Sequence, residues 1–155
     1  MEQKLIICNT LHDFDLAKKM TLDYFDWLGE DLFYQGLERE MSFFHHIYNK
    51  PKGAFIYVKI NDEIAGGVGV RKLEEGICEM KRLYVYEKYR GHNLGQLLCD
   101  KLIEISKQLG YSKMRLDTLP TLKNAVELYE KMGFNPIPKY YNNPDARVVY
   151  LEKEL

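Results

Sequence analysis

The sequence predicts an α/β fold, in which helices flank a mixed, mostly antiparallel sheet with a central β-α-β unit. Two observations lead to this prediction. Three apolar β-type runs, at residues 53–60, 63–73 and 77–86, are joined by short connections, as the strands of an antiparallel meander are. A helix-patterned stretch at 94–109 then leads into another β-type run at 113–118, and a helical crossover of this kind places its two strands parallel.

Length and composition bound the class of protein. The chain has 155 residues, enough for one substantial core and too few for two ordinary domains, so we expect a single domain over residues 1–155. It is 46% hydrophobic and 29% charged with a net charge of -1, which describes a compact soluble protein without the basic surface that binds nucleic acid. The cysteines Cys8, Cys78 and Cys99 lack the spacing of a zinc or redox site, so we expect reduced thiols and no metal.

The chain shows no membrane or export signal. No apolar run approaches the roughly 20 residues of a spanning helix, and the start lacks the apolar core of a signal peptide. We therefore expect a cytoplasmic protein with neither a membrane nor nucleic acid as a partner.

The N-terminal third is expected to hold one strand and two helices. KLIICN at 4–9 is a short β-type run, Asp13 is a suitable N-cap for the first helix, and Gly29 is a suitable end. NKPKG at 49–53 ends the second helix. The expected apolar face is formed in the first helix by Leu16, Met20, Tyr24, Trp27 and Leu28, and in the second by Leu37, Met41, Phe44 and Tyr48.

The C-terminal half is expected to hold two further helices. The first follows RGHNLGQ at 90–96 and ends at Gly110. The second covers about 122–132, stops at Gly133, and is followed by a Pro-interrupted stretch and a β-type run at 146–155. Their apolar residues are Leu94, Leu97, Leu98, Leu102, Ile105 and Leu109 in the first, and Ala125, Leu128 and Met132 in the second.

The loop at 90–96 carries the pattern of an anion-binding site. A helix N-terminus leaves backbone N–H groups unpaired and is partly positive, and Gly91 and Gly95 would let these donors approach a phosphate closely. Arg90 would add a charge-assisted contact. The same residues also suit a tight turn before a helix with a solvated arginine. The stretch is neither a P-loop nor GxGxxG, so it gives no support to nucleotide hydrolysis.

Three segments, CEMKRLYVYEKYRGHNLGQLL, LDT and NAVELYEKMGF, resemble the signature segments of the GNAT family of acyl-CoA-dependent N-acetyltransferases. The resemblance covers about residues 54–155 and is strongest between 78 and 134. It implies a GNAT-like sheet, one N-acetyltransferase domain, and acetyl-CoA as co-substrate without a metal. The cofactor-binding residues that it implies are Leu83, Tyr84, Val85, Arg90, Gly91, His92, Asn93, Leu94, Gly95, Gln96 and Asn124.

The family's loop, Gln/Arg-x-x-Gly-x-Gly/Ala, holds the pyrophosphate of acetyl-CoA on its backbone amides and falls here on Arg90, Asn93 and Gly95. Asn93 departs from the usual central glycine. If that position needs a positive φ, asparagine is the least costly substitute, at the expense of some cofactor affinity.

The resemblance also places the pantetheine arm of the cofactor between the strands at 77–86 and 113–118. The backbone groups of Leu83 and Val85 would pair with this arm as with an added strand. We expect a β-bulge near Arg82, because strict alternation would put two charged and two apolar residues of the first strand on one face. Those four residues are Glu79, Lys81, Leu83 and Val85.

Two side chains are candidates for the chemistry. An amine of pKa about 10.4 must lose a proton before it attacks, at a cost of roughly 4.6 kcal/mol at pH 7, and the resemblance places Glu79 as the base, acting directly or through water. Glu79 could instead be a surface carboxylate paired with Lys81 or Arg82. Tyr129 matches the tyrosine that family members direct at the departing sulfur, and could otherwise be a core aromatic.

The acceptor is less well specified. Segments 27–40 and 140–144 would flank the cleft, and their aromatic and polar groups suit a small amine. We therefore expect an N-acetyltransferase that moves an acetyl group directly from acetyl-CoA to the primary amine of a small molecule. The alternatives are acetylation of protein lysine or N-terminal amines, and a non-catalytic acyl-CoA sensor. The amine, the acyl-chain preference and the oligomeric state stay open, with a homodimer among the states considered.

Overall fold

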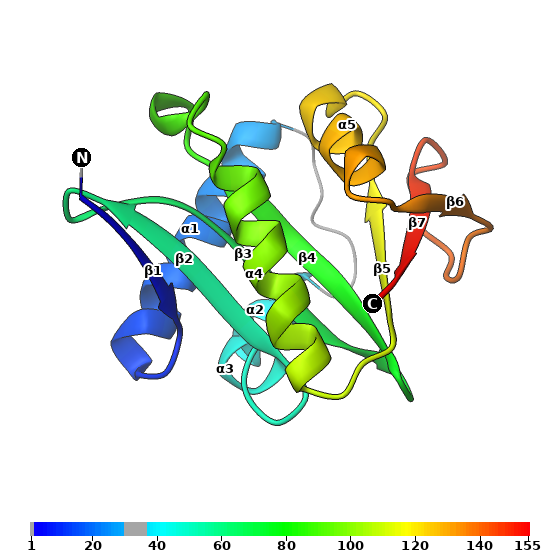
Figure 1. Ribbon diagram of the computed structural model, residues 1–155, viewed down its shortest axis with the longest axis horizontal. Coiled ribbons are helices and arrows are strands. Elements are labelled where there is room, and N and C mark those ends of the chain that lie inside the picture. The colour runs from blue at the N-terminus through cyan, green and yellow to red at the C-terminus, as the bar shows by residue number, and fades with distance from the viewer. Residues whose placement is uncertain (1, 30–36) are drawn as a thin grey trace.

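The computed structural model describes residues 2–29 and 37–155. In this part of the chain a seven-stranded sheet has helices on both faces, as predicted (Figure 1). The strands are β1 (Gln3–Ile7), β2 (Ala54–Ile60), β3 (Glu63–Glu74), β4 (Ile77–Val85), β5 (Lys113–Thr118), β6 (Asn135–Ile137) and β7 (Val149–Glu154). The helices are α1 (Leu11–Leu28), α2 (Leu37–Ser42), α3 (Phe44–Ile47), α4 (Leu94–Gln108) and α5 (Lys123–Lys131), with a 3-10 turn at Glu87–Tyr89.

The strand order is β1-β2-β3-β4-β5-β7-β6. Strands β1 to β4 form an antiparallel meander, and α4 carries the chain across to β5, which runs parallel to β4. Their pairing covers only Ile77–Glu79 of β4, with Glu79 opposite Arg115 as the last pair. Beyond it the two strands part (Figure 1). The predicted β-α-β unit is therefore present, and its strands diverge on the side where α4 begins.

Residues next to each end of α1 determine where the helix begins and ends. Thr10 is the N-cap, and its side chain accepts a hydrogen bond from the Asp13 amide at 3.1 Å. The prediction that Asp13 caps the helix is therefore wrong. Asp13 is the third helical residue, and its carboxylate accepts a hydrogen bond from the backbone amide of Thr10, which completes a capping box. Gly29 ends the helix in the left-handed conformation at φ 67°, as predicted.

The buried face of α1 differs from the predicted one. Of the predicted residues only Met20 is fully buried, and Trp27 is 42% exposed. Tyr24, Trp27 and Leu28, from the predicted face, instead line a cleft. The residues buried in this helix are Phe14, Ala17, Met20, Thr21 and Phe25.

The predicted second helix is divided into α2 and α3, which are separated at Phe43. Its apolar stripe still reaches the core, since Leu37, Phe44 and Tyr48 are buried. Strand β6 lies in the Pro-interrupted stretch, for which no strand was predicted. It is an edge strand, where Pro136 is tolerated because one side of its backbone needs no partner.

A β-bulge in β4 distributes its side chains between the two faces of the sheet, as predicted. Arg82 has a positive φ of 63°, and the register with β3 shifts there, so that Gly67 lies opposite Tyr84 but Gly69 lies opposite Lys81. Leu83 and Val85 join Met80 in the core beneath α4. Tyr84 joins the second core, beneath α1.

Within the described ranges, no helix is long and apolar enough to cross a membrane. Cys8, Cys78 and Cys99 are buried and unpaired, as expected from their spacing.

Candidate functional site

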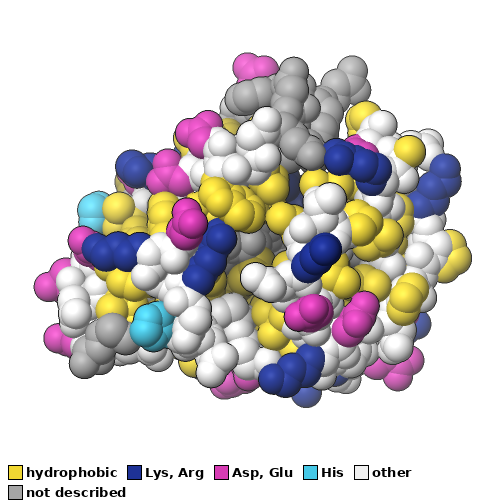
Figure 2. Space-filling model, turned by 90° about the horizontal axis from the view of Figure 1, so that it is seen from above, with side chains coloured by type: hydrophobic (Ala, Val, Ile, Leu, Met, Phe, Trp, Pro, Cys, Tyr) yellow, Lys and Arg dark blue, Asp and Glu magenta, His cyan; other side chains and the backbone are white. Residues whose placement is uncertain are grey.

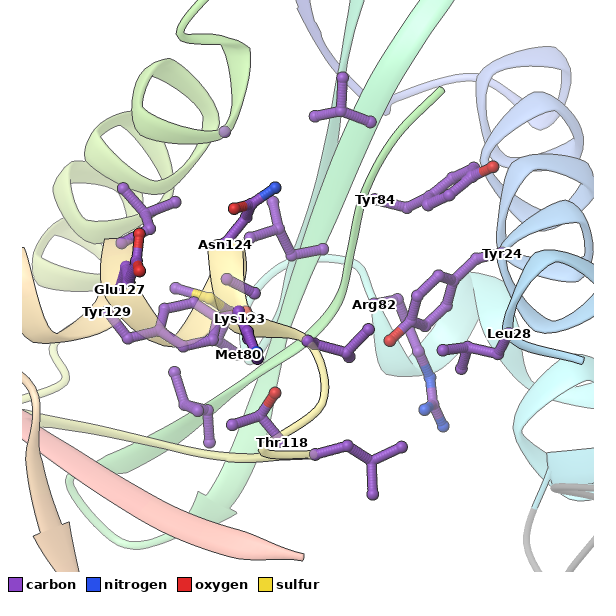
Figure 3. A pocket seen from close by; sticks show the side chains of 18 of the residues that line it. Tyr24, Leu28, Met80, Arg82, Tyr84, Thr118, Lys123, Asn124, Glu127 and Tyr129 are labelled. Carbon is purple, nitrogen blue, oxygen red and sulfur yellow. The ribbon is translucent and has the colours of Figure 1, made fainter. Parts of the chain in front are cut away.

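A cleft of about 770 Å³ opens where β4 and β5 part. In Figure 3, Tyr24 and Leu28 of α1 lie on one side of it, and Asn124 and Tyr129 of α5 lie on the other. Strand β4 contributes a continuous run of lining residues from Met80 to Val85. Figure 2 views the molecule from above and shows hydrophobic side chains gathered across this face among scattered Lys and Arg.

The N-terminus of α4 faces this cleft with free backbone donors. Asn93 stands immediately before the helix at φ 58° and ψ 26°, and its side chain does not cap it. Over residues 2–29 and 37–155 no acceptor contacts the amides of Leu94, Gly95 or Gln96. The expectation that Asn93 tolerates a positive φ is confirmed, and the left-handed turn leaves these donors available to an anion.

The glycines of the loop have different tasks. Gly91 needs its positive φ of 87°, whereas Gly95 is helical and lies against α5. A Cβ at Gly95 would stand 3.3 Å from Cδ2 of Leu128. A larger side chain there would press against Leu128 in the part of the cleft that both residues line.

Arg90 places a positive charge at the rim of the cleft. Its Nε donates to the carbonyl of Val85 at 3.1 Å, and its guanidinium lies 4.5 Å from the centre of the Trp27 ring. These contacts orient an otherwise exposed cation. Of the predicted loop, every residue from 90 to 96 lines the cleft except His92, which the structure does not bring to it.

The edge of β4 that faces the cleft has no strand beside it after Glu79, within the described residues. The predicted cofactor residues Leu83, Tyr84 and Val85 all line the cleft on this edge. The carbonyl of Val85 already accepts a hydrogen bond from Arg90. That carbonyl is therefore occupied, and the rest of the edge can pair with an extended ligand, as an added strand would.

Tyr129 lies between cleft and core. It lines the cleft with 6% of its surface exposed, and its ring packs edge-on against Phe134 at 5.8 Å. Its hydroxyl has no hydrogen-bond partner in the described part of the chain. Burial raises the pKa of Tyr129 well above its usual range, so the group remains a proton donor. Asn124, at the start of the same helix, also lines the cleft.

Glu79 lies on β4, the strand before the loop, as the sequence places it, but its side chain is buried. It is 1% exposed and does not line the cleft. Arg71 Nε donates to Oε1 at 3.0 Å, and the Tyr140 hydroxyl donates to Oε2 at 2.6 Å. It is thus a buried carboxylate rather than a surface one. Lys81 Nζ lies 3.8 Å from Oε1 of Glu79. Arg82 pairs with Glu40 instead.

From the sequence, Arg82 and Lys81 were expected only as partners of Glu79, and Glu40 and Asp117 were given no role. Arg82 donates to both oxygens of Glu40, at 2.9 and 2.7 Å. Lys81 Nζ lies 3.6 Å from Oδ1 of Asp117, and both of these residues line the cleft. The signal for Lys81 was in the sequence, because it follows Glu79 by two residues on one face of a strand.

The segments expected to hold the acceptor only partly do so. In 140–144, Asn143 lines the cleft, while Tyr140 and Tyr141 hydrogen-bond to Glu79 and Asp117. In 27–40, Trp27 and Leu28 line it, and 30–36 lies outside the described residues. Among described side chains, no group of three or more His, Cys, Asp or Glu could hold a metal ion.

Comparisons with known proteins agree with this geometry. A model of the acetyltransferase (GNAT) family matches residues 21–134. An uncharacterised N-acetyltransferase of Schizosaccharomyces pombe is 39% identical over 147 residues, which cover 92% of this chain and 89% of the relative.

Two solved structures share the fold. An acetyltransferase from Streptococcus agalactiae has a TM-score of 0.80 at 21% identity, covering 99% of this chain and 98% of that one. PaiA N-acetyltransferase from Thermoplasma acidophilum, in complex with coenzyme A, has a TM-score of 0.70 at 17% identity, covering 100% of both chains. With the family match and the relative in Schizosaccharomyces pombe, the conclusion is that this chain belongs to the acetyltransferase (GNAT) family and is an N-acetyltransferase.

Proposed function

We propose that this protein transfers the acetyl group of acetyl-CoA directly to the primary amine of a small molecule. The observation that carries the proposal is the cleft between β4 and β5, which joins an unpaired helix N-terminus to a free strand edge. A pyrophosphate needs backbone donors and positive potential, and an amide-bearing arm needs a strand edge. The likeness in fold to a structure that holds coenzyme A supports this assignment.

The residues present fit the cofactor. The amides of Leu94, Gly95 and Gln96 would hold its pyrophosphate, with Arg90 as a charge-assisted contact at the rim. The edge of β4 at Leu83 would pair with the arm, and Asn124 would contact it from α5. Bound acetyl-CoA supplies an activated thioester, whose leaving thiol has a pKa comparable to that of cysteine, about 8.5.

Tyr129 would assist departure of the thiolate. Its hydroxyl is protonated, borders the cleft, and has no partner among the described residues that competes for its proton. A modest donor suffices, because the leaving group is only weakly basic.

Glu79 would receive the amine proton indirectly. Its carboxylate does not line the cleft, and both oxygens hold hydrogen bonds from Arg71 and Tyr140. A water or the Tyr140 hydroxyl would therefore stand between the amine and Glu79. The contribution of such a base is typically about 10²- to 10⁴-fold.

The acceptor would enter on the α1 side of β4. Tyr24 and Trp27 line that side, and Tyr24 lies 5.3 Å from the Tyr84 ring, so the wall is largely aromatic. Aromatic walls with a few polar groups suit a small molecule.

The test combines binding and turnover. Acetyl-CoA should bind in calorimetry, and a panel of amines screened by thiol release should identify acceptors. Gly95→Glu should abolish binding, because it adds a bulky carboxylate at a cleft-lining residue of the loop whose amides are unpaired. The matched control is Gln108→Glu, which adds the same charge at the exposed far end of α4 and should bind normally.

Each outcome separates the alternatives. Turnover of peptides but not of small amines would identify a protein acetyltransferase. Binding without turnover of either would identify a sensor. Normal binding by Gly95→Glu would show that the loop is not the phosphate site.

A further inference from the structure

Lys81 carries an ammonium that lines the cleft and has no hydrogen-bond acceptor among the described residues. Its side chain is 9% exposed and lines the cleft. The nearest anionic atoms, Oδ1 of Asp117 and Oε1 of Glu79, lie at 3.6 and 3.8 Å from Nζ, beyond ordinary hydrogen-bond distance. An ammonium has three donors, and none of them has a described acceptor within hydrogen-bond distance, although the group is accessible from the cleft.

The neighbouring anions are already engaged by other groups. Glu79 accepts from Arg71 and Tyr140, and Asp117 accepts from the Tyr141 hydroxyl. Burial, with the charge of Arg82, lowers the pKa of Lys81 against the opposing pull of these two carboxylates. An ammonium with little access to water and no anion at hydrogen-bond distance would gain from an anionic ligand in the cleft.

The position of Lys81 relates it to the acceptor rather than to the cofactor. It precedes the bulge at Arg82 and shares the face of β4 that carries Glu79, away from Met80, which packs beneath α4. Lys81 is also just past the last β4–β5 pair, at the floor of the cleft.

We infer that Lys81 determines acceptor specificity by binding a carboxylate of the acceptor, so that the substrate is a small amino carboxylate rather than a simple amine. This inference rests on the proposed function and names its substrate class. Asp117, which also lines the cleft, supplies the complementary charge for the ammonium end of such a zwitterion before it loses its proton. Burial opposes ionisation of Asp117, but the charge of Lys81 and the Tyr141 hydrogen bond outweigh it and lower its pKa.

The experiment compares matched acceptors that differ only in the carboxylate. The probes are alanine with alaninamide, and β-alanine with β-alaninamide, assayed by thiol release with acetyl-CoA. Lys81→Met removes the charge and keeps a stem of similar length. For at least one pair, the ratio of kcat/KM for the acid to that for the amide should fall by about 10- to 100-fold, since a hydrogen bond between charged groups is lost. Comparing ratios cancels the different basicities of the two amines.

Two controls separate a specific role from a general one. Lys131→Met removes an exposed lysine of the same cleft and should leave the ratio unchanged. Lys81→Arg keeps a cation and should retain part of the preference. Unchanged melting temperature and acetyl-CoA affinity in Lys81→Met would show that the variant is folded.

A binding measurement tests the inference without turnover. With coenzyme A present, N-acetylalanine or N-acetyl-β-alanine should bind the wild type more tightly than its amide, and Lys81→Met should lose the difference. If wild type and Lys81→Met show the same acid-to-amide ratio of kcat/KM and the same product binding, Lys81 does not bind a carboxylate of the acceptor and the inference fails. If amines other than amino carboxylates are the better acceptors, the proposed function stands and this inference alone is wrong. If no amine is acetylated, it is the proposed function that fails.

Discussion

Tyr129→Phe removes one hydroxyl from the cleft while the ring keeps its contact with Phe134. If Tyr129 donates a proton or hydrogen bond to the departing thiolate, kcat should fall by about 10²-fold, within the usual range for an acid catalyst. The affinity for acetyl-CoA should change little. The fall in kcat and in kcat/KM should be similar, because the lost interaction belongs to the transition state.

The structure gives the expected effect on stability. The Tyr129 hydroxyl makes no hydrogen bond within the described residues, so its removal leaves no partner unsatisfied. A buried hydroxyl without a partner costs about 1–3 kcal/mol, and this one still borders the cleft. The free energy of unfolding should therefore stay equal or rise by up to about 1 kcal/mol, and the melting temperature by no more than about 2–4 °C.

Tyr140→Phe is the contrasting variant, because its hydroxyl donates to the buried carboxylate of Glu79 at 2.6 Å. Removing that donor should cost about 1–3 kcal/mol and lower the melting temperature by several degrees.

The assay is steady-state thiol release with the best amine of the panel, beside thermal unfolding of both variants. Tyr129→Phe should have a lower kcat than the wild type and at least the same melting temperature, and Tyr140→Phe should have a lower melting temperature than the wild type. Wild-type kcat in a normally melting Tyr129→Phe would refute the role, and Tyr129 would then be a packing residue.

Three further predictions follow from the loop and the buried charges. Asn93→Ala should lower the free energy of unfolding by about 1 kcal/mol in thermal melts because of the left-handed backbone, while Asn93→Gly should not and should bind acetyl-CoA at least as tightly. Glu79→Gln should lower kcat at pH 7 by roughly 10²-fold, and a pH–rate profile should show the loss shrinking as the free amine becomes abundant; an unchanged profile would exclude Glu79. Burial opposes ionisation of Glu40, but the hydrogen bonds and charge of Arg82 outweigh it and lower the pKa of Glu40 below its ordinary value of about 4.3. The stability from this pair is therefore complete above that value and is lost as pH falls through the folded-state pKa, so Glu40→Gln should flatten the acid side of a melting-temperature profile; an equal slope in both proteins would contradict this.

Some features of the site were predictable because they depend on few neighbouring residues. The left-handed turn at Asn93 and the end of α1 at Gly29 follow from the steric freedom of single residues. The order of strands β2 to β5 followed from short connections and a helical crossover. The bulge at Arg82 was predicted because strict alternation along this strand would have put charged and apolar side chains on the same face.

The capping of α1 shows the limit of this local reasoning. Asp13 was predicted as the N-cap because aspartate is a good cap residue, but the cap is Thr10 and Asp13 is the third helical residue. Both residues take part, because in a capping box each of the two side chains accepts a hydrogen bond from the backbone amide of the other residue.

Only the tertiary structure decided the environment of Glu79 and Lys81. Arg71 meets Glu79 because the β3–β4 register places these residues opposite each other, and Tyr140 reaches it from a segment 61 residues away. The sequence by itself determined most of the elements, the left-handed turn at Asn93 and the bulge, since each follows from local sterics and periodicity. It did not determine β6, the division of the second helix or the buried face of α1. Which charges are paired and which one faces the cleft without a hydrogen bond depends on register and on contacts between distant segments, and no local pattern encodes these.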